Sequence, residues 1–258
     1  MSSVTTLAVS VIDVGKGDCI LLQADNKTIL IDTGYESTAP DVLSHLEAMG
    51  VDHLDVMIIT HYDRDHVEGM LPIGEAMDVS AIYLPGYEGS DKNYRLCVSS
   101  ATTLDAPVHR VTEKFALCMG DARLTVFPSR VTYRPGSGKV EGNDNDMSLV
   151  ATLTNGRDSY LFAGDLEEDG IAAYLADSHG QYDILKVPHH GQLSSCTSDF
   201  LYDVRPKIAV ITDAQKDPAD KKTLKLLKSV GVKTYRTSTD GTIVIESDGS
   251  GAYAVWFV

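Results

Sequence analysis

A short polar segment that directly follows an apolar run constrains this chain more than any other feature. The segment THYDRDHVEG at positions 60–69 places two histidines and two aspartates in six consecutive positions: His61, Asp63, Asp65 and His66. A strand that ends at Ile59 would bring these side chains to the rim of a sheet, where alternation sends His61, Asp63 and Asp65 to one side. Imidazole and carboxylate groups together suit Zn, Mn or Fe, and without a cation they would repel one another or stay unsatisfied. The segment therefore predicts a metal site, and a solvated polar turn is the alternative.

Two distant segments end an apolar run in a similar way. The run 161–163 is followed by Gly164 and Asp165, and the run 185–187 is followed after Pro188 by His189 and His190. The other four histidines have no such neighbours and are interpreted as surface or core residues: His45, His53, His109 and His179. Three polar strand ends in one chain favour a single shared metal site.

Short apolar segments with strand character alternate with helix-like segments along the chain. Strands are expected at 6–14, 19–24, 28–31, 56–59, 81–84, 124–127, 148–153, 159–163, 184–187, 208–212, 232–235, 242–246 and 252–258. Helices are expected at 40–49, 66–77, 94–104, 167–176, 198–202 and 221–230. This alternation predicts an α/β layered sandwich. Because no repeat or linker interrupts it, residues 1–258 are expected to form a single domain.

The charge of the chain narrows the classes of substrate. A formal net charge of -15 argues against the extended basic surface with which proteins hold nucleic acid. A polyanionic substrate would then need a local positive centre, which bound divalent cations or a few basic residues can supply. Arg64 at the mouth of the site, and Arg134 and Lys139 on a loop that could fold over the metals, are the candidates for binding substrate. A purely solvated loop is the alternative for the last two.

The apolar runs, the N-terminal residues and the cysteines indicate the cellular compartment of the protein. No run approaches the about 18 apolar residues that a membrane helix needs, and the first residues lack the features of a signal peptide. The four cysteines are widely spaced and contain no CxxC pair. We therefore expect a soluble cytoplasmic protein with free thiols and no membrane partner.

The order of these motifs resembles that of the metallo-β-lactamase fold superfamily of binuclear metallohydrolases. The shared elements are Ile31-Asp32-Thr33-Gly34, His61-x-Asp63-x-Asp65-His66, Gly164-Asp165 and His189-His190-Gly191. Within the superfamily, the chain is most similar to the soluble hydrolase domain of ComEC-type competence proteins and their stand-alone relatives. That closer similarity rests on four stretches, at 12–19, 145–150, 186–191 and 235–241. Together the motifs span residues from about 8 to 250.

The resemblance implies a four-layer αββα sandwich with two divalent metal ions, Zn2+ or Mn2+, at one edge of the sheets. Carried over by position, His61 and Asp63 would hold one ion, and Asp65, His66 and His190 the other. Asp165 would bridge the two ions. Asp32 would be a buried carboxylate that orients the ligands.

This chain departs from the superfamily pattern at two places. Asp63 stands where many members have histidine, and 145–148 stands where a further histidine ligand is common. Oxygen ligands favour a harder metal, so manganese is as plausible as zinc. Within 145–148, either Asn145 or Asp146 could coordinate an ion, and Ser148 is expected to support the ligands from behind.

The resemblance and the ligand set together imply hydrolysis by attack of a metal-bound hydroxide, since a bound water can ionise at a pH of about 7. A phosphodiester of single-stranded DNA, a nucleotide or a small molecule is the favoured substrate. Asp63, Asp65 and Asp165 are the candidate catalytic carboxylates, and His189 is the candidate general acid or leaving-group contact. Hydrolysis of a lactone, thioester or β-lactam, or a non-catalytic binding module, are the alternatives. The segment Gly15-Lys16-Gly17-Asp18 lacks the spacing of a phosphate-binding loop and is interpreted as a hairpin turn held by Asp13 and Asp18.

Overall fold

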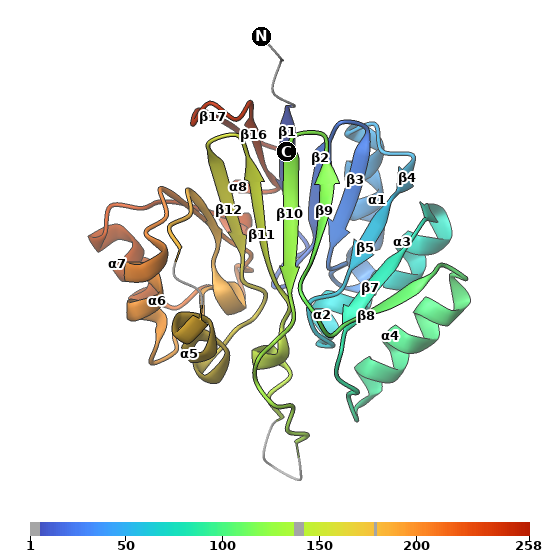
Figure 1. Ribbon diagram of the computed structural model, residues 1–258. Helices are drawn as coiled ribbons and strands as arrows, with labels where there is room; N and C mark the ends of the chain where they lie inside the picture. Colours follow the sequence, from blue (N-terminus) through green and yellow to red (C-terminus); the bar gives the residue numbers. More distant parts are fainter. Residues whose placement is uncertain (1–5, 137–141, 178–179) are drawn as a thin grey trace.

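Two β-sheets lie face to face, and helices cover the outer face of each sheet (Figure 1). The computed structural model describes residues 6–136, 142–177 and 180–258. The first sheet has eight strands in the order β17 (Tyr253–Phe257), β16 (Ile243–Ser247), β1 (Leu7–Val11), β2 (Ile20–Ala24), β3 (Lys27–Ile31), β5 (Val56–Ile58), β7 (Ile82–Pro85) and β8 (Val108–Val111). The second has seven in the order β15 (Lys233–Arg236), β14 (Ile208–Ile211), β13 (Ile184–Lys186), β12 (Asp158–Phe162), β11 (Val150–Asn155), β10 (Ala122–Phe127) and β9 (Phe115–Met119). The short strands β4 (His53–Leu54) and β6 (Asp78–Val79) pair with each other.

Each sheet contains a run of parallel strands connected through helices. Strands β3, β5, β7 and β8 are parallel, and so are β12, β13, β14 and β15. Parallel strands need a crossover, and the crossovers are α1 (Ala39–Ala48), α3 (Met70–Ala76) and α4 (Lys92–Thr103) for the first sheet and α5 (Glu168–Asp177), α6 (Thr197–Val204) and α7 (Lys221–Ser229) for the second. Short helices are α2 (Arg64–Val67) and α8 (Thr237–Asp240), and one-turn 3-10 helices are η1 (Glu36–Thr38), η2 (Asn145–Met147) and η3 (Pro188–Gly191).

Three apolar layers fill the spaces between these four layers of structure. Leu22 and Ile31 of the first sheet meet Leu153 and Val210 of the second in the central layer. The neighbouring residues of the same strands point outward, so that Leu21 packs in the layer under α1 and α3. The strands read as continuous apolar runs because both of their faces are buried. The αββα sandwich implied by the resemblance is confirmed.

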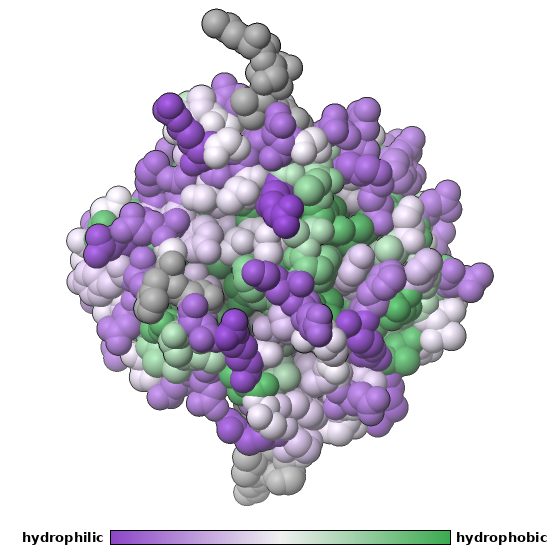
Figure 2. Space-filling view, viewed as in Figure 1, coloured by the Kyte–Doolittle hydropathy of each residue, from purple (hydrophilic) through white to green (hydrophobic). Residues whose placement is uncertain are grey.

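The surface of the molecule is apolar where the second sheet reaches its edge. Figure 2 shows hydrophilic residues around most of the periphery of one face, with hydrophobic residues towards its centre, over β9 and β10. Phe115 and Leu117 of β9 are only half-buried against the central layer. In the part of the chain that the structure describes, no helix is long and apolar enough to span a membrane.

The expected helices and strands agree with the structure within a few residues, except that one expected helix is divided and that β4, β6, β8, β9 and α8 were not expected. The helix expected at 66–77 is two helices, because α2 ends at Val67 and α3 begins at Met70. Gly69 lies between them, packed so closely on the carbonyl of Thr33 that a Cβ atom would clash. Strands β8 and β9 were not expected from the sequence, since β8 is largely exposed and shows no apolar alternation.

Candidate metal centre

The predicted site residues meet at the edge where the parallel strands of both sheets end. Asp32 follows β3, and the 60–69 segment follows β5 through Ile59. Asp165 follows β12, and the histidine pair follows β13. The fold therefore places the carboxyl ends of strands from two different sheets side by side, which is how residues about a hundred positions apart share one site.

Three buried histidines gather around Asp165. The Nε2 atoms of His61, His66 and His190 are buried and make no hydrogen bond of acceptable geometry. Oδ2 of Asp165 lies 3.4 Å from Nε2 of His66 and 2.9 Å from Nε2 of His190. An unsatisfied buried polar atom costs about 1–3 kcal/mol, so three in one place indicate a missing partner.

The donor atoms are close enough for shared coordination. Ligand atoms of His61, His66 and Asp165 all lie within 4.8 Å of one another, and the same holds for Asp65, His66 and His190. Oδ2 of Asp65 is 3.3 Å from Nε2 of His190. Imidazole nitrogens with carboxylate oxygens are the donors that zinc and manganese take in proteins, so these residues fit two divalent ions.

The other nitrogen of each ring is held by a different group. Nδ1 of His66 lies 2.8 Å from Oδ2 of Asp32, and Nδ1 of His190 lies 3.0 Å from the hydroxyl of Thr212. Nδ1 of His61 lies 3.1 Å from the hydroxyl of Thr60 and 3.3 Å from that of Ser148. Contacts of this kind fix the ring orientation and leave Nε2 free to bind a metal.

Asp32 and Ser148 lie where the sequence predicts them, behind the ligands. Asp32 is buried and accepts hydrogen bonds from both the amide and the hydroxyl of Thr60, each at 2.7 Å. Its backbone φ is +57°, a left-handed conformation that costs a residue with a side chain about 1–3 kcal/mol. The hydroxyl of Ser148 accepts a hydrogen bond from the amide of Asp165 at 3.0 Å. Because the same hydroxyl lies next to Nδ1 of His61, Ser148 connects Asp165 with the ring of His61.

The turn that carries the histidine pair is also strained. His189 and His190 have φ values of +46° and +52°, and Gly191 continues the turn at +78°. This left-handed turn separates the two side chains, because His190 is buried in the site whereas His189 is only partly buried beside it. Conformations of this kind concentrate at functional sites.

Burial and neighbouring charges shift the pKa values of the cluster in opposite directions. Burial lowers the pKa of His61 to about 4, which keeps its imidazole neutral. Burial also disfavours a charge on His190, but Asp165 outweighs it and raises the pKa of His190 to about 9. Asp165 and Asp32 likewise raise the pKa of His66 against its burial. The cluster is built for positive charge, which divalent ions would supply in place of protons.

The carboxylates of the cluster differ in their surroundings. Burial would raise the pKa values of Asp65 and Asp165, but the adjacent imidazoles of His66 and His190 lower both. Asp63 differs, because the partial removal of its carboxyl group from solvent raises its pKa to about 6, and the charges of Asp65 and Asp165 add to this effect. Among these three carboxyl groups, Asp63 is therefore the one that takes up a proton most readily.

Asp63 and Asn145 lie at the border of the cluster. Oδ2 of Asp63 is 3.9 Å from Nε2 of His61, and 41% of the side chain is exposed. Asn145 donates its Nδ2 to Glu167 at 3.0 Å, while its buried Oδ1 has no hydrogen-bond partner. Asp146 instead accepts the amides of Glu167 and Gly170, at 2.9 Å and 2.7 Å, next to the start of α5. Between the two alternatives at 145–148, the geometry favours Asn145.

His189 is positioned by a carboxylate that the sequence did not identify. Its Nδ1 lies 3.0 Å from Oε1 of Glu167, and its Nε2 lies 3.4 Å from Nδ2 of Asn145. The hydrogen bond from His189 is the main reason why the pKa of Glu167 is lowered. An open polar trough of about 460 Å³ begins beside this pair and is lined by Lys16, Gln192 and Ser194.

Two further charged residues were missed as parts of the site. Asp18 was interpreted as a residue that holds a hairpin turn, but it is buried, and its Oδ1 accepts the hydroxyl of Thr212 at 2.6 Å. Lys186 is equally buried and contacts both Asp18 and Asp165. The sequence feature that could have identified Lys186 is its position as a lysine inside the apolar run of β13. Gly17 lets the loop that carries Asp18 pack closely against Asp65, because a Cβ atom at position 17 would lie only 2.7 Å from the carbonyl oxygen of Asp65.

The predicted substrate-binding residues have other contacts. Nε of Arg64 donates to Glu68 at 2.7 Å, and its guanidinium lies over the ring of Tyr35. Arg134 forms an ion pair with Asp169 of α5 at 2.5 Å, which connects its loop to that helix. Lys139 lies outside the described residues. A role of these three residues in binding substrate stays a prediction.

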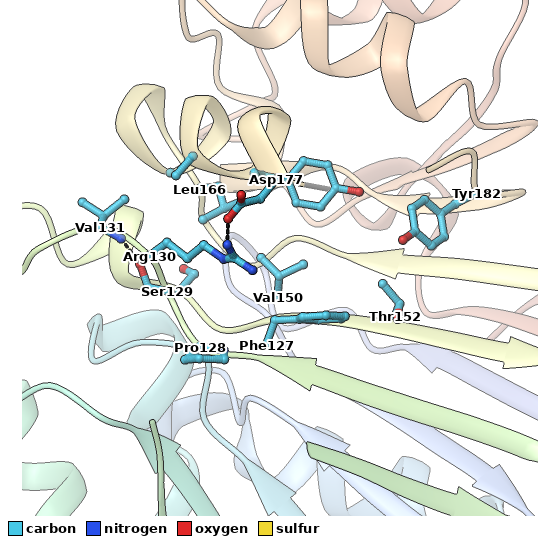
Figure 3. A pocket seen from close by; sticks show the side chains of 14 residues that line it. Phe127, Pro128, Ser129, Arg130, Val131, Val150, Thr152, Leu166, Asp177 and Tyr182 are labelled. Carbon is cyan, nitrogen blue, oxygen red and sulfur yellow. Dashed lines mark hydrogen bonds and ion pairs between the residues drawn. The ribbon is translucent and has the colours of Figure 1, made fainter. Parts of the chain in front are cut away.

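An apolar cavity lies away from the candidate ligands. It is bounded by Phe127, Val150 and Leu166 and is bordered by the ion pair between Arg130 and Asp177 (Figure 3). Its free space of about 50 Å³ is too small for a substrate, although it touches Ser148. The trough beside His189 is the larger opening next to the chemistry.

Comparisons with curated proteins agree with this geometry. The chain is 28% identical to ComE operon protein 3 of Bacillus subtilis (strain 168), over 91% of this chain and 32% of that protein. It is 28% identical to competence protein ComA of Neisseria gonorrhoeae, over 92% of this chain and 32% of that protein. The chain therefore spans about a third of the length of these relatives, and the resemblance to ComEC-type proteins is confirmed.

Solved structures share the fold at low sequence identity. The metallo-beta-lactamase fold protein YhfI from Bacillus subtilis superposes with a TM-score of 0.58 at 14% identity, covering 94% of this chain and 100% of that chain. A diphosphatase from the PhnP family superposes with a TM-score of 0.54 at 17% identity, covering 93% and 98%. The family model described as "Metallo-beta-lactamase superfamily" matches residues 12–212, which include each candidate ligand. The chain belongs to the metallo-beta-lactamase superfamily.

Proposed function

We propose that this protein is a binuclear metal-dependent hydrolase of phosphodiesters. The observation that carries the proposal is the set of buried, unsatisfied Nε2 atoms of His61, His66 and His190, two of which lie 3.4 Å and 2.9 Å from Oδ2 of Asp165. His61, Asp63 and the amide oxygen of Asn145 would hold one ion. Asp65, His66 and His190 would hold the other, and Asp165 would lie between them. Divalent ions bound there would activate a water molecule and neutralise charge on the substrate.

Two features of the ligand set favour a phosphodiester. The first ion would have one imidazole and two oxygen donors, a hard set that suits manganese as well as zinc. Two adjacent cations can neutralise both the attacking and the leaving oxygens of a phosphoryl centre. The diphosphatase with the same fold supports the choice by analogy, although fold alone does not define activity.

The protein's own residues would position the substrate and its leaving group. His189 faces the site from the strained turn and is held by Glu167, so it is placed to contact the leaving oxygen. The trough lined by Lys16, Gln192 and Ser194 would receive the part of the substrate beyond the scissile bond. A net charge of -15 favours a nucleotide, a short single strand or a small phosphodiester over long DNA. The fold and the cysteine pattern are compatible with the cytoplasmic location expected from the sequence, which we retain as part of the proposal.

Purified protein tested with Mn2+ or Zn2+ against bis-p-nitrophenyl phosphate and a simple lactone would check this function. We expect metal-dependent hydrolysis of the phosphodiester and little turnover of the lactone. His190→Ala should abolish it, whereas His109→Ala, which alters an exposed histidine of β8 stacked on Tyr83, should not. Turnover of the lactone alone would overturn the phosphodiester assignment. Absence of both metal and activity would favour a binding module.

A further inference from the structure

Lys186 is a buried cation in direct contact with the candidate metal ligands. It is the last residue of β13, and its side chain is 1% exposed. Its Nζ donates to the carbonyl of Gly164 at 3.1 Å and to Oδ1 of Asp165 at 3.2 Å. Its third contact is Oδ2 of Asp18 at 2.5 Å. An ammonium group has three N–H donors, so these three oxygens satisfy it completely.

The surroundings of Lys186 favour its charged form. Burial alone lowers the pKa of Lys186, but Asp18 and Asp165 outweigh this effect and raise the pKa above its usual value. A buried charge is tolerated only when it is paired and hydrogen-bonded. The pair of Lys186 and Asp18 is neutral as a unit, so it adds no net charge to the metal centre.

The two carboxylate oxygens of Asp165 have different contacts. Oδ1 is the oxygen that Lys186 contacts, whereas Oδ2 is the oxygen near His66 and His190. Without the lysine, the carboxylate could turn and offer both oxygens to one ion. The position of the ammonium group therefore limits how Asp165 can coordinate.

The same network reaches one of the histidines from behind. Asp18 uses Oδ2 for Lys186 and Oδ1 for the hydroxyl of Thr212. That hydroxyl lies 3.0 Å from Nδ1 of His190. A single chain of contacts thus runs from Asp165 through Lys186, Asp18 and Thr212 to the ring of His190, and Lys186 is the member that contacts Asp165.

We infer that Lys186 is a positioning residue of the metal centre: it holds Oδ1 of Asp165, so that Oδ2 would be the oxygen left to bind the ions. This role rests on the proposed metal centre. It differs from a packing role, because it predicts a change in how the ions are coupled and not only in stability. A bridge through one oxygen keeps two ions close, whereas chelation of one ion by both oxygens would weaken the link between them.

The test is electron paramagnetic resonance of the protein comprising residues 1–258, loaded with two equivalents of Mn2+. The wild-type protein should show the signal of an exchange-coupled pair of ions. In Lys186→Met the intensity of that signal at equal manganese content should fall by more than half. Lys207→Met is the matched control, because Lys207 forms an exposed ion pair with Asp183 and should leave the signal unchanged.

A second variant guards against simple unfolding of the first. Lys186→Met combined with Asp18→Asn removes both charges of the buried pair, and its fold can be checked by circular dichroism. It should lose the coupled signal in the same way. A coupled signal of wild-type intensity in either folded variant would overturn the role of Lys186. Failure of the wild-type protein to bind two ions would overturn the metal centre itself and this role with it.

Discussion

Oδ2 of Asp32 lies 2.8 Å from Nδ1 of His66, and both side chains are buried. The carboxylate is itself fixed by two hydrogen bonds from Thr60, so it holds the imidazole in one orientation. The ring then presents Nε2 to the space beside Asp165. A ligand that is oriented in this way needs no rearrangement when an ion binds.

Asp32→Asn should weaken metal binding while leaving the ligands themselves intact. The amide is a poorer acceptor for the N–H of His66 and removes the buried charge that favours a cation. Loss of such a supporting contact typically costs about 10–100-fold in metal affinity. Competition with a chelating dye would measure the effect. Asp41→Asn, an exposed change on α1, is the control, and equal affinities of the two variants would argue against the role of Asp32.

His189→Ala should impair turnover without removing metal. The ring contacts Glu167 and Asn145 and is placed to assist departure of the leaving oxygen. Loss of a general acid typically lowers the rate by about 10²–10⁴-fold, most strongly when the leaving group is a poor one. Activity on an alkyl phosphodiester should therefore fall far more than activity on the p-nitrophenyl ester. An equal loss on both substrates would contradict this role, as would loss of metal.

Acid should destabilise the protein partly through His45, which lies outside the site on α1. Burial lowers the pKa of this histidine, so the unfolded chain binds its proton more readily than the folded protein. The stability that its neutral form contributes is present above the unfolded pKa of about 6.5 and is lost as pH falls through the lowered folded value. Urea unfolding at pH 7 and pH 5 should show a smaller loss for His45→Gln than for the wild-type protein. His53→Gln, at a half-exposed histidine paired with Asp52, should not reduce that loss.

Much of the architecture is readable from the sequence because the strands are buried on both faces and appear as apolar runs. The crossover helices follow from the apolar stripes between them, as in α7, where Leu227 is buried and Lys228 is not. Strand β8 cannot be predicted in this way, because an edge strand with three exposed residues does not appear as an apolar run. The break between α2 and α3 depends on a backbone contact of Gly69 that only the folded chain forms.

Some residues of the candidate site can likewise be predicted from the sequence, and others cannot. Polar residues near strand ends indicate His61, His66, Asp165 and His190, since each belongs to a short polar segment that comes after an apolar run. The pairing of Lys186 with Asp18 could not be predicted, because it joins β13 to a loop of the other sheet. The sequence likewise leaves the choice between Asn145 and Asp146 open, because the two amides next to the start of α5 that donate to Oδ1 of Asp146 are brought there only by the folded chain.

The most direct test of the central claim is the metal content of the purified protein measured together with its phosphodiesterase activity. We predict that the wild-type chain binds two divalent ions and hydrolyses bis-p-nitrophenyl phosphate. Asp165→Ala should lose both properties together, because it removes the carboxylate that contacts His66, His190 and Lys186. A variant that keeps two ions and normal turnover would contradict the metal centre as described.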